Sequence, residues 1–229
     1  PVLEGRSQLD ITGLIGQYAH GNEPSHHIAY LYAYAGQPWK TQQRVRQILD
    51  EFYSDRRDGL IGNEDCGQMS AWYVFSALGF YPVNPGQPIY VIGTPLFPRV
   101  SMRLPNGRTL TVRSEGGGPG RPYIQSATLN GQRFSRSWIT HEEIVSGGEL
   151  VFQMSNVPDT TRGTTASDRP PVPASTRVTL TPVVTPSRQT FTDSLVVTLQ
   201  TGTAGAQIAY TLDGSDPSEE SPRSAGPLT

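Results

Sequence analysis

The sequence has 229 residues, with 18 lysines and arginines against 20 aspartates and glutamates, which gives a formal net charge of −2. This near balance offers no electrostatic footprint for a polyanion, so a nucleic-acid partner is not expected. No apolar run approaches the ~20 residues that span a bilayer. The 24 glycines and 20 prolines indicate many turns and short strands. The single cysteine, Cys66, leaves the redox compartment open.

Three amphipathic helices are expected in the first third, over residues 24–35, from about residue 41 to 52, and over 66–78. The first two follow from apolar residues at helical spacing: Ile28, Leu31, Tyr32 and Ala35, then Val45, Ile48, Leu49 and Phe52. The third has Asp65 as its expected cap, Gln68 reaching back to it and Gly79 closing it. Short connections would make neighbouring helices antiparallel, so the first and third would begin on one side of the structure.

The middle of the chain changes to the two-residue period of strands. Five short strands are expected, with Asn106-Gly107 and Asn130-Gly131 as hairpin turns. They are Ile89 to Ile92, Val100 to Leu104, Thr109 to Arg113, Tyr123 to Leu129 and Leu150 to Met154. We expect a small antiparallel layer.

A polar stretch over residues 156–176 follows, crowded with Pro, Thr and Ser, and it is expected to act as a semi-stiff linker. Strands resume over Val178 to Pro182, Ser194 to Thr201 and Gln207 to Leu212, and a tight turn is expected at Asp213-Gly214-Ser215-Asp216-Pro217. Because the chain opens on Pro1 and stops mid-pattern at Thr229, we expect it to be a segment of a longer polypeptide.

Two polar clusters precede the first and third expected helices. In the first, Asn22 and Glu23 stand before Pro24, with His26 and His27 just after. A helix start explains the cap and the proline. Two histidines, a carboxylate and an amide exceed what a cap requires, and such a glutamate suits sugar hydroxyls or a hard cation.

The second cluster is Asn63, Glu64 and Asp65, followed by Cys66 and Gln68. Asp65 and Gln68 fit a cap pair, yet a carboxylate at a helix start is also held ionised, as a general base must be. Composition alone does not decide between the two interpretations. Cys66 lacks a partner motif for a nucleophile, and we interpret it as a small thiol behind the cap.

These clusters carry a specific family resemblance. The segment from His20 to His27, with Ala35 to Thr41 and Gly62 to Tyr73, closely resembles the glycoside hydrolase family 92 α-mannosidases over about residues 1–158. The segment from Tyr210 to Pro227 is similar to the chitobiase/β-hexosaminidase carboxy-terminal module.

The first resemblance implies a secreted, exo-acting, inverting, calcium-dependent α-mannosidase that hydrolyses terminal α-mannosidic bonds of N-glycans or mannans. It implies Asp65 as general base, supported by Glu64 and Asn63. It implies that Asn22, Glu23, His26 and His27 contact the sugar and that Glu23 lies near Ca²⁺. The catalytic acid of the family lies upstream, so this chain alone is expected to hydrolyse nothing and to need the upstream part of the same polypeptide.

The expected fold class is therefore α+β multidomain. Residues 1–87 would be the last helices of an (α/α)6 toroid, 88–155 an antiparallel β layer on it, 156–176 the linker and 177–229 a partial β-sandwich. The expected location is secreted, periplasmic or at the surface of a bacterial cell.

Two other interpretations remain open at this stage. The chain could belong to a non-catalytic carbohydrate-binding or adhesion protein, although Glu23 and Asp65 are both present and favour hydrolysis. The terminal module could also serve only as a spacer.

Overall fold

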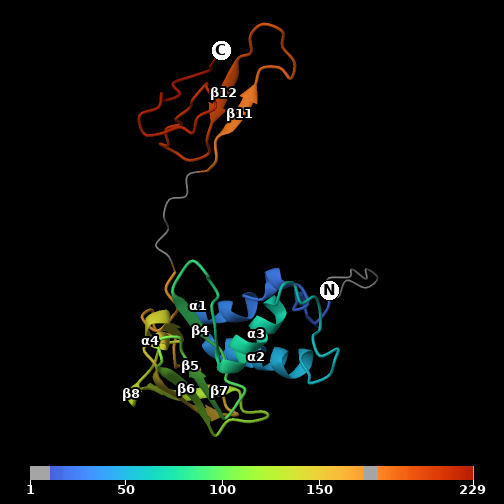
Figure 1. Cartoon of the computed structure of the whole chain (residues 1–229), viewed down its shortest axis with the longest axis vertical. Coiled ribbons are helices and arrows are strands. Elements are labelled where there is room, and N and C mark those ends of the chain that lie inside the picture. Colours follow the sequence, from blue (N-terminus) through green and yellow to red (C-terminus); the bar gives the residue numbers. More distant parts are fainter. Residues whose placement is uncertain (1–10, 173–179, 229) are drawn as a thin grey trace. The chain divides into compact units, whose positions relative to one another are not determined.

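The computed structural model describes residues 11–172 and 180–228, and the chain divides into two compact units, Pro1–Val172 and Pro173–Thr229 (Figure 1). The described part of the first unit opens with a two-stranded hairpin, β1 (Leu14–Ile15) and β2 (Tyr18–Ala19). None of the helices in the described ranges is long and apolar enough to cross a membrane.

The helix expected over residues 24–35 is broken into short turns. Two 3₁₀ turns, η1 (Glu23–Ser25) and η2 (Ile28–Tyr30), lead into the short helix α1 (Leu31–Tyr34). The buried residues are His26, Ala29, Tyr30 and Ala33, whereas Ile28 and Leu31 are 41% and 43% exposed. The buried face is therefore opposite to the one predicted, and a tertiary contact explains why. The buried Tyr30 hydroxyl forms a hydrogen bond of 2.8 Å with Ser76 Oγ, which holds the face that carries Tyr30 toward the core.

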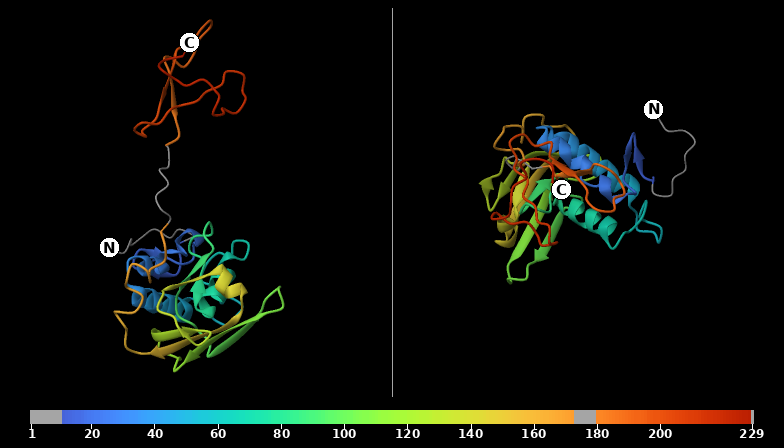
Figure 2. Two further views of the ribbon diagram at one scale, coloured as in Figure 1. Left: turned by 90° about the vertical axis from the view of Figure 1, so that its left-hand side faces the viewer. Right: turned by 90° about the horizontal axis from the view of Figure 1, so that it is seen from above.

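The other two helices match their predictions except at their starts. Helix α2 (Pro38–Phe52) begins three residues before Thr41, with Pro38 in its first turn. Helix α3 (Gln68–Leu78) begins after Gly67 and ends, as expected, at Gly79, whose φ is 103°. In Figure 1 and in the left view of Figure 2, the helices lie on one side of the larger sheet.

The expected antiparallel layer is two sheets, and the larger one is mixed. A three-stranded sheet joins β3 (Phe80–Tyr81), β4 (Ile89–Ile92) and β9 (Trp138–Thr140). The five-stranded sheet has the order β5-β6-β10-β7-β8. Its strands are β5 (Arg99–Arg103), β6 (Thr109–Glu115), β7 (Tyr123–Leu129), β8 (Gln132–Arg133) and β10 (Gly148–Ser155).

Strand β10 is the reason the antiparallel prediction is wrong. It inserts between β6 and β7, pairing parallel with β6 and antiparallel with β7. The two hairpin turns are confirmed: Asn106-Gly107 joins β5 to β6, and Asn130-Gly131, with φ of 53° and 78°, joins β7 to β8. Turn residues predict which adjacent strands pair as hairpins. They do not predict the position of a strand, such as β10, that follows later in the sequence.

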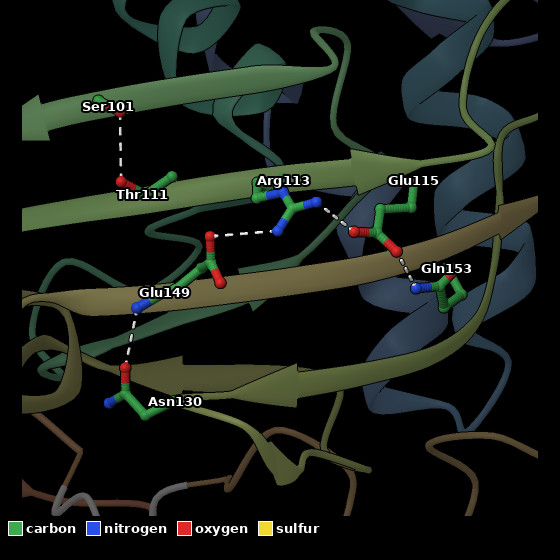
Figure 3. Close-up of polar contacts among 7 residues, drawn as sticks. All are labelled: Ser101, Thr111, Arg113, Glu115, Asn130, Glu149 and Gln153. Carbon is green, nitrogen blue, oxygen red and sulfur yellow. Dashed lines mark hydrogen bonds and ion pairs between the residues drawn. The ribbon is translucent and has the colours of Figure 1, made fainter.

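One core cluster takes its buried residues from both sheets, and the partly buried Phe75 and Leu78 of α3 pack against it. Leu110 and Val112 of β6 alternate inward beside Leu150 and Phe152 of β10. A second cluster fills the space among the helices, with Trp72 fully buried at its centre. On the solvent face of the sheet, Arg113 pairs with Glu115 and Glu149, and Gln153 donates to Glu115 (Figure 3). Such exposed pairs contribute little stability, but they keep this face polar.

The linker was predicted over residues 156–176, but residues 156–172 belong to the first unit, and residues 173–176 lie outside the described residues. The backbone oxygen of Asp168 accepts bonds of 2.8 Å from both the amide and the hydroxyl of Ser137. Gly163 lies against Pro38 and Ser137, where an added Cβ would be 3.2 and 3.3 Å from their side chains. A polar segment can therefore be ordered by backbone hydrogen bonds without apolar burial of its own.

Helix α4 (His141–Val145) was not predicted. Thr140 and Glu143 form a reciprocal capping box at its start. The Thr-x-x-Glu pattern before Ile144 was the available signal in the sequence. Burial raises the pKa of Glu143, but hydrogen bonds from Thr140 and the neighbouring Arg136 outweigh this effect. The pKa of Glu143 therefore lies below its usual value.

The second unit is sparse in regular structure over residues 180–228. Strands β11 (Val183–Pro186) and β12 (Val197–Gln200) form an antiparallel pair. The strand expected over Gln207 to Leu212 is reduced to one bridge, from Ala209 to Arg223, and part of the strand expected over Val178 to Pro182 lies outside the described residues. The turn at Asp213 is confirmed, since its Oδ1 accepts from the Ser215 amide at 3.0 Å and hydroxyl at 2.6 Å.

Candidate active site

The two polar clusters found in the sequence lie side by side. The Asn63 amide donates to the Gly21 carbonyl at 3.4 Å, and a Cβ placed on Gly62 would be only 2.3 Å from Gly21 Cα. This backbone contact requires glycine at position 62, whereas an added Cβ at Gly21 would lie 1.8 Å from Thr12 Oγ1. The site residues of segment 20–27 and of segment 61–68 are thus brought together from opposite ends of α2.

Glu23 opens the turn η1. Its Oε2 atom is buried with no hydrogen-bond partner in the described part of the chain. The Asn22 carbonyl accepts from the Ser25 amide at 3.1 Å and hydroxyl at 2.8 Å, which fixes the backbone around Glu23. A buried acceptor without a donor is costly, so Glu23 is prepared for a ligand that donates or for a cation.

The two clustered histidines predicted to contact a sugar have different surroundings. His27 is exposed, whereas His26 is buried with both ring nitrogens engaged. Its Nε2 donates to the His20 carbonyl at 3.0 Å, and its Nδ1 accepts from Gln68 Nε2 at 3.2 Å. These partners define a neutral tautomer. His26 therefore holds segment 20–27 against α3 and leaves no ring nitrogen free in this arrangement.

His20 begins the same segment, is fully buried and was not predicted as a site residue. Its Nδ1 and Nε2 are each 2.6 Å from a tyrosine hydroxyl, of Tyr18 and Tyr53 respectively. It stacks on His26 with ring centroids 4.6 Å apart and meets Trp72 edge-on. Burial, with the nearby His26, lowers the pKa of His20 to about 3, and burial also lowers the pKa of His26. Both rings are therefore neutral at ordinary pH.

The loop before α3 has an unusual backbone. Asp65, Cys66 and Gly67 have φ of 41°, 57° and 90°, three left-handed residues in succession. For residues other than glycine this conformation costs roughly 1–2 kcal/mol each. Strain of this kind persists where the surrounding structure imposes it, and it concentrates at functional sites. The result is an Asp65 side chain presented to solvent at the end of the loop.

The predicted cap of α3 is wrong in its residue. Helix α3 begins one residue after Gly67, and the carboxylate of Glu64 serves its first turn by accepting from the Ser70 amide at 3.4 Å and hydroxyl at 3.0 Å. The Nε2 of Gln68 donates to His26 and, at 3.0 Å, to the Tyr81 hydroxyl. The N-cap residue is Gly67, whose position in the left-handed region ends the loop that contains Asp65.

The described residues do not make a complete calcium site. Across residues 11–172 and 180–228, no three His, Cys, Asp or Glu side chains gather closely enough to hold a metal ion. Ca²⁺ prefers ~6–8 oxygen ligands. Glu23 Oε2 is one suitable oxygen, so these residues alone do not form the metal site.

The roles of two supporting residues could not be predicted from the sequence. His20 contacts Tyr53 and Gln68 contacts His26, and both partners are distant in the sequence. No periodic pattern in the sequence predicts the contact of Gly21 with Gly62. A glycine before each polar cluster, at positions 21 and 62, was the one available signal of a close backbone approach.

Two solved structures of family GH92 are similar to this chain. The α-mannosidase BT3965 of family GH92 from Bacteroides thetaiotaomicron is 42% identical, with a TM-score of 0.69 over 71% of this chain and 22% of its own. The family GH92 inverting mannosidase BT2199 from the same species is 53% identical, with a TM-score of 0.64 over 68% of this chain and 21% of its own.

An uncharacterized secreted glycosidase of Arthroderma benhamiae is 39% identical over 154 residues, which are 66% of this chain and 20% of the relative. The chain thus spans about a fifth of the length of these relatives. The chitobiase/beta-hexosaminidase C-terminal domain matches residues 186–229. The glycosyl hydrolase family 92 catalytic domain matches residues 3–156, and on this match the chain belongs to glycosyl hydrolase family 92.

Proposed function

We propose that this chain is part of a secreted, exo-acting, inverting α-mannosidase and that Asp65 is its general base. The observation that carries the proposal is the strained loop that exposes Asp65 beside the Glu23 segment. Inversion needs one ionised carboxylate that holds water and one protonated carboxyl on the leaving oxygen, ~6.5–9.5 Å apart. A solvent-exposed aspartate fits the first role.

In this proposal the neighbouring residues divide the remaining tasks. Glu64 fixes the start of α3 and thereby the position of Asp65, and Asn63 joins the loop to Gly21. Asn22, Glu23 and His27 meet the sugar, and buried His26 positions them. The catalytic acid lies in the upstream part of the polypeptide, where the helices that complete the toroid also lie, and the substrate is a glycan with terminal α-mannose.

Calcium is part of the same proposal, with Glu23 as one ligand and the others outside this chain. Bound Ca²⁺ would supply polarisation of the sugar hydroxyls. The unpartnered Glu23 Oε2 supports this assignment. A Glu23→Gln variant of the full-length protein is expected to bind Ca²⁺ more weakly in calorimetry.

The decisive experiment is Asp65→Asn in the full-length protein. We expect kcat on an aryl α-mannoside to fall by about 10³-fold or more with KM little changed, because the lost base acts only in the transition state. NMR of the first-formed mannose should show the β anomer for the parent enzyme.

Asp58→Asn is the matched control, since Asp58 is exposed in the same α2–α3 connection. Near-normal turnover by Asp65→Asn, or α-mannose as first product, would contradict the proposal. If the full-length protein binds mannosides without turnover, it is a carbohydrate-binding protein instead. Residues 1–229 alone are expected to give no turnover.

A further inference from the structure

A second cavity lies away from the loops of Glu23 and Asp65. Its volume is about 230 Å³, and it lies between β7, β8 and the segment that follows β10. The polar and charged residues that line it include Gln125, Ser126, Arg133, Asp159, Arg162 and Asp168. In Figure 1, β8 lies on the opposite side of the first unit from the α2–α3 connection. No assigned role of the chain uses these residues.

Arg162 has donors without acceptors. Its Nη2 donates to the carbonyls of Phe134 and Arg136, both at 3.2 Å. Its Nε and Nη1 atoms are buried, with no hydrogen-bond partner in the part of the chain that the structure describes. Burial lowers the pKa of Arg162 to about 10, against the opposing effect of Asp159 and Asp168, so the guanidinium is still charged at neutral pH. Unsatisfied donors on a buried charge call for an acceptor from outside.

The carboxylates of Asp159 and Asp168 already accept hydrogen bonds from other groups. Asp168 accepts from the Ser135 hydroxyl at 2.7 Å and the Thr165 hydroxyl at 2.8 Å. Asp159 accepts from the Thr161 amide at 2.8 Å and from the Arg162 amide at 3.1 Å. The donors and acceptors of the cavity are thus fixed in place before any ligand arrives, which lowers the entropy cost of binding.

The charges of the cavity cancel, since two arginines face two aspartates. A balanced site has no general attraction for an anion. Hydroxyl groups both accept and donate, so a polyol can take hydrogen bonds from Arg162 and give them to the aspartates. The volume is below the ~300–1,000 Å³ of pockets for drug-sized ligands, which limits the occupant to about one ring. We propose that this cavity binds a single neutral hexopyranose, as a glycan-binding site separate from the site of hydrolysis.

The test is a titration of the 229-residue chain followed by ¹H–¹⁵N NMR. The probes are methyl α-mannopyranoside and methyl β-glucopyranoside, with acetate and inorganic phosphate as anion probes. We expect saturable shifts from a sugar at the Arg162 Nε–H and at the amides of residues 125–135 and 159–168. Binding does not require turnover, so this result is independent of the proposed activity.

Two variants make the test specific. Ser126→Ile fills the cavity from an exposed strand position and is expected to weaken binding at least about tenfold. Ser101→Ile, the same change on an exposed residue of β5 outside the cavity, should leave it unchanged. Arg162→Met should abolish binding, and if that variant does not fold, Ser126→Ile decides. The proposal is overturned if no sugar shifts Arg162, if the anions saturate the site equally well, or if Ser126→Ile binds like the parent.

Discussion

At the scale of single residues, His20 is the most heavily constrained group beneath the candidate active site. It is fully buried, and both of its nitrogens contact tyrosine hydroxyls. A neutral imidazole satisfies this arrangement, with one nitrogen donating and one accepting. An imidazolium would place two donors there and a charge among aromatic rings. The cost of that charge is why the pKa of His20 falls to about 3.

The low pKa of His20 predicts that stability falls in acid. Below pH ~6.5 the unfolded chain binds a proton that the native His20 refuses until about pH 3, so the unfolding free energy rises with pH across this window. His20 alone should remove about 2 kcal/mol between neutral pH and pH ~5, and the lowered pKa of His26 acts in the same direction. Urea unfolding of the chain at several pH values measures this slope.

Two variants separate His20 from the rest of the protein. His20→Gln keeps a donor and an acceptor but does not titrate, so its stability should depend less steeply on pH. His27→Gln removes an exposed histidine of the same segment and should keep the parent slope. Equal slopes for His20→Gln and the parent would show that His20 is not the source of the acid sensitivity.

At the scale of elements, prediction from sequence worked where the signal is local. Helix α2, the end of α3 at Gly79 and both Asn-Gly hairpins follow from spacing or turn chemistry. The prediction failed where a contact with a residue distant in the sequence determines the local structure. The first helix exposes Ile28 because Tyr30 bonds to Ser76, forty-six positions away, and β10 inserts beside β6 without any local turn. For the same reason the local pattern predicted Asp65 as the cap of α3, whereas the N-cap is Gly67 and the carboxylate of Glu64 accepts from Ser70.

The contact between the two loops predicts an effect of one methyl group. In Gly62→Ala the new Cβ would lie 2.3 Å from Gly21 Cα and 2.4 Å from its carbonyl oxygen, so the loops must separate. We expect a loss of about 1–3 kcal/mol in unfolding free energy, and in the full-length protein a lower kcat, because the Asp65 loop moves relative to Glu23. Thermal unfolding and turnover measure the two effects.

Gly226→Ala is the control for the added methyl group, since nothing lies within 4 Å of the position that the new Cβ would take and the change should be neutral. A Gly62→Ala protein with parent stability and turnover would mean that the loops tolerate displacement and that their contact does not position the site.

At the scale of the whole chain, the first unit ends later than the family match. The family match stops at residue 156, whereas the compact unit continues to Val172. The extra segment supplies Arg162, whose guanidinium donates to two backbone carbonyls, and Asp168, whose carbonyl accepts from Ser137. It also forms one wall of the cavity proposed to bind a hexopyranose. These contacts make residues 157–172 part of the folded unit and not a spacer.

Truncation tests this boundary directly. A fragment that ends at Val172 should retain the unfolding midpoint of the first unit in the parent chain, because it keeps every contact of Arg162 and Asp168. A fragment that ends at Asn156 leaves the Ser137 amide and hydroxyl without their acceptor and uncovers Phe134 and Pro38. With each lost hydrogen bond worth ~0.5–1.5 kcal/mol, it should be less stable by several kcal/mol. Equal midpoints for the two fragments in thermal unfolding would contradict this prediction and would show that residues 157–172 act as a linker.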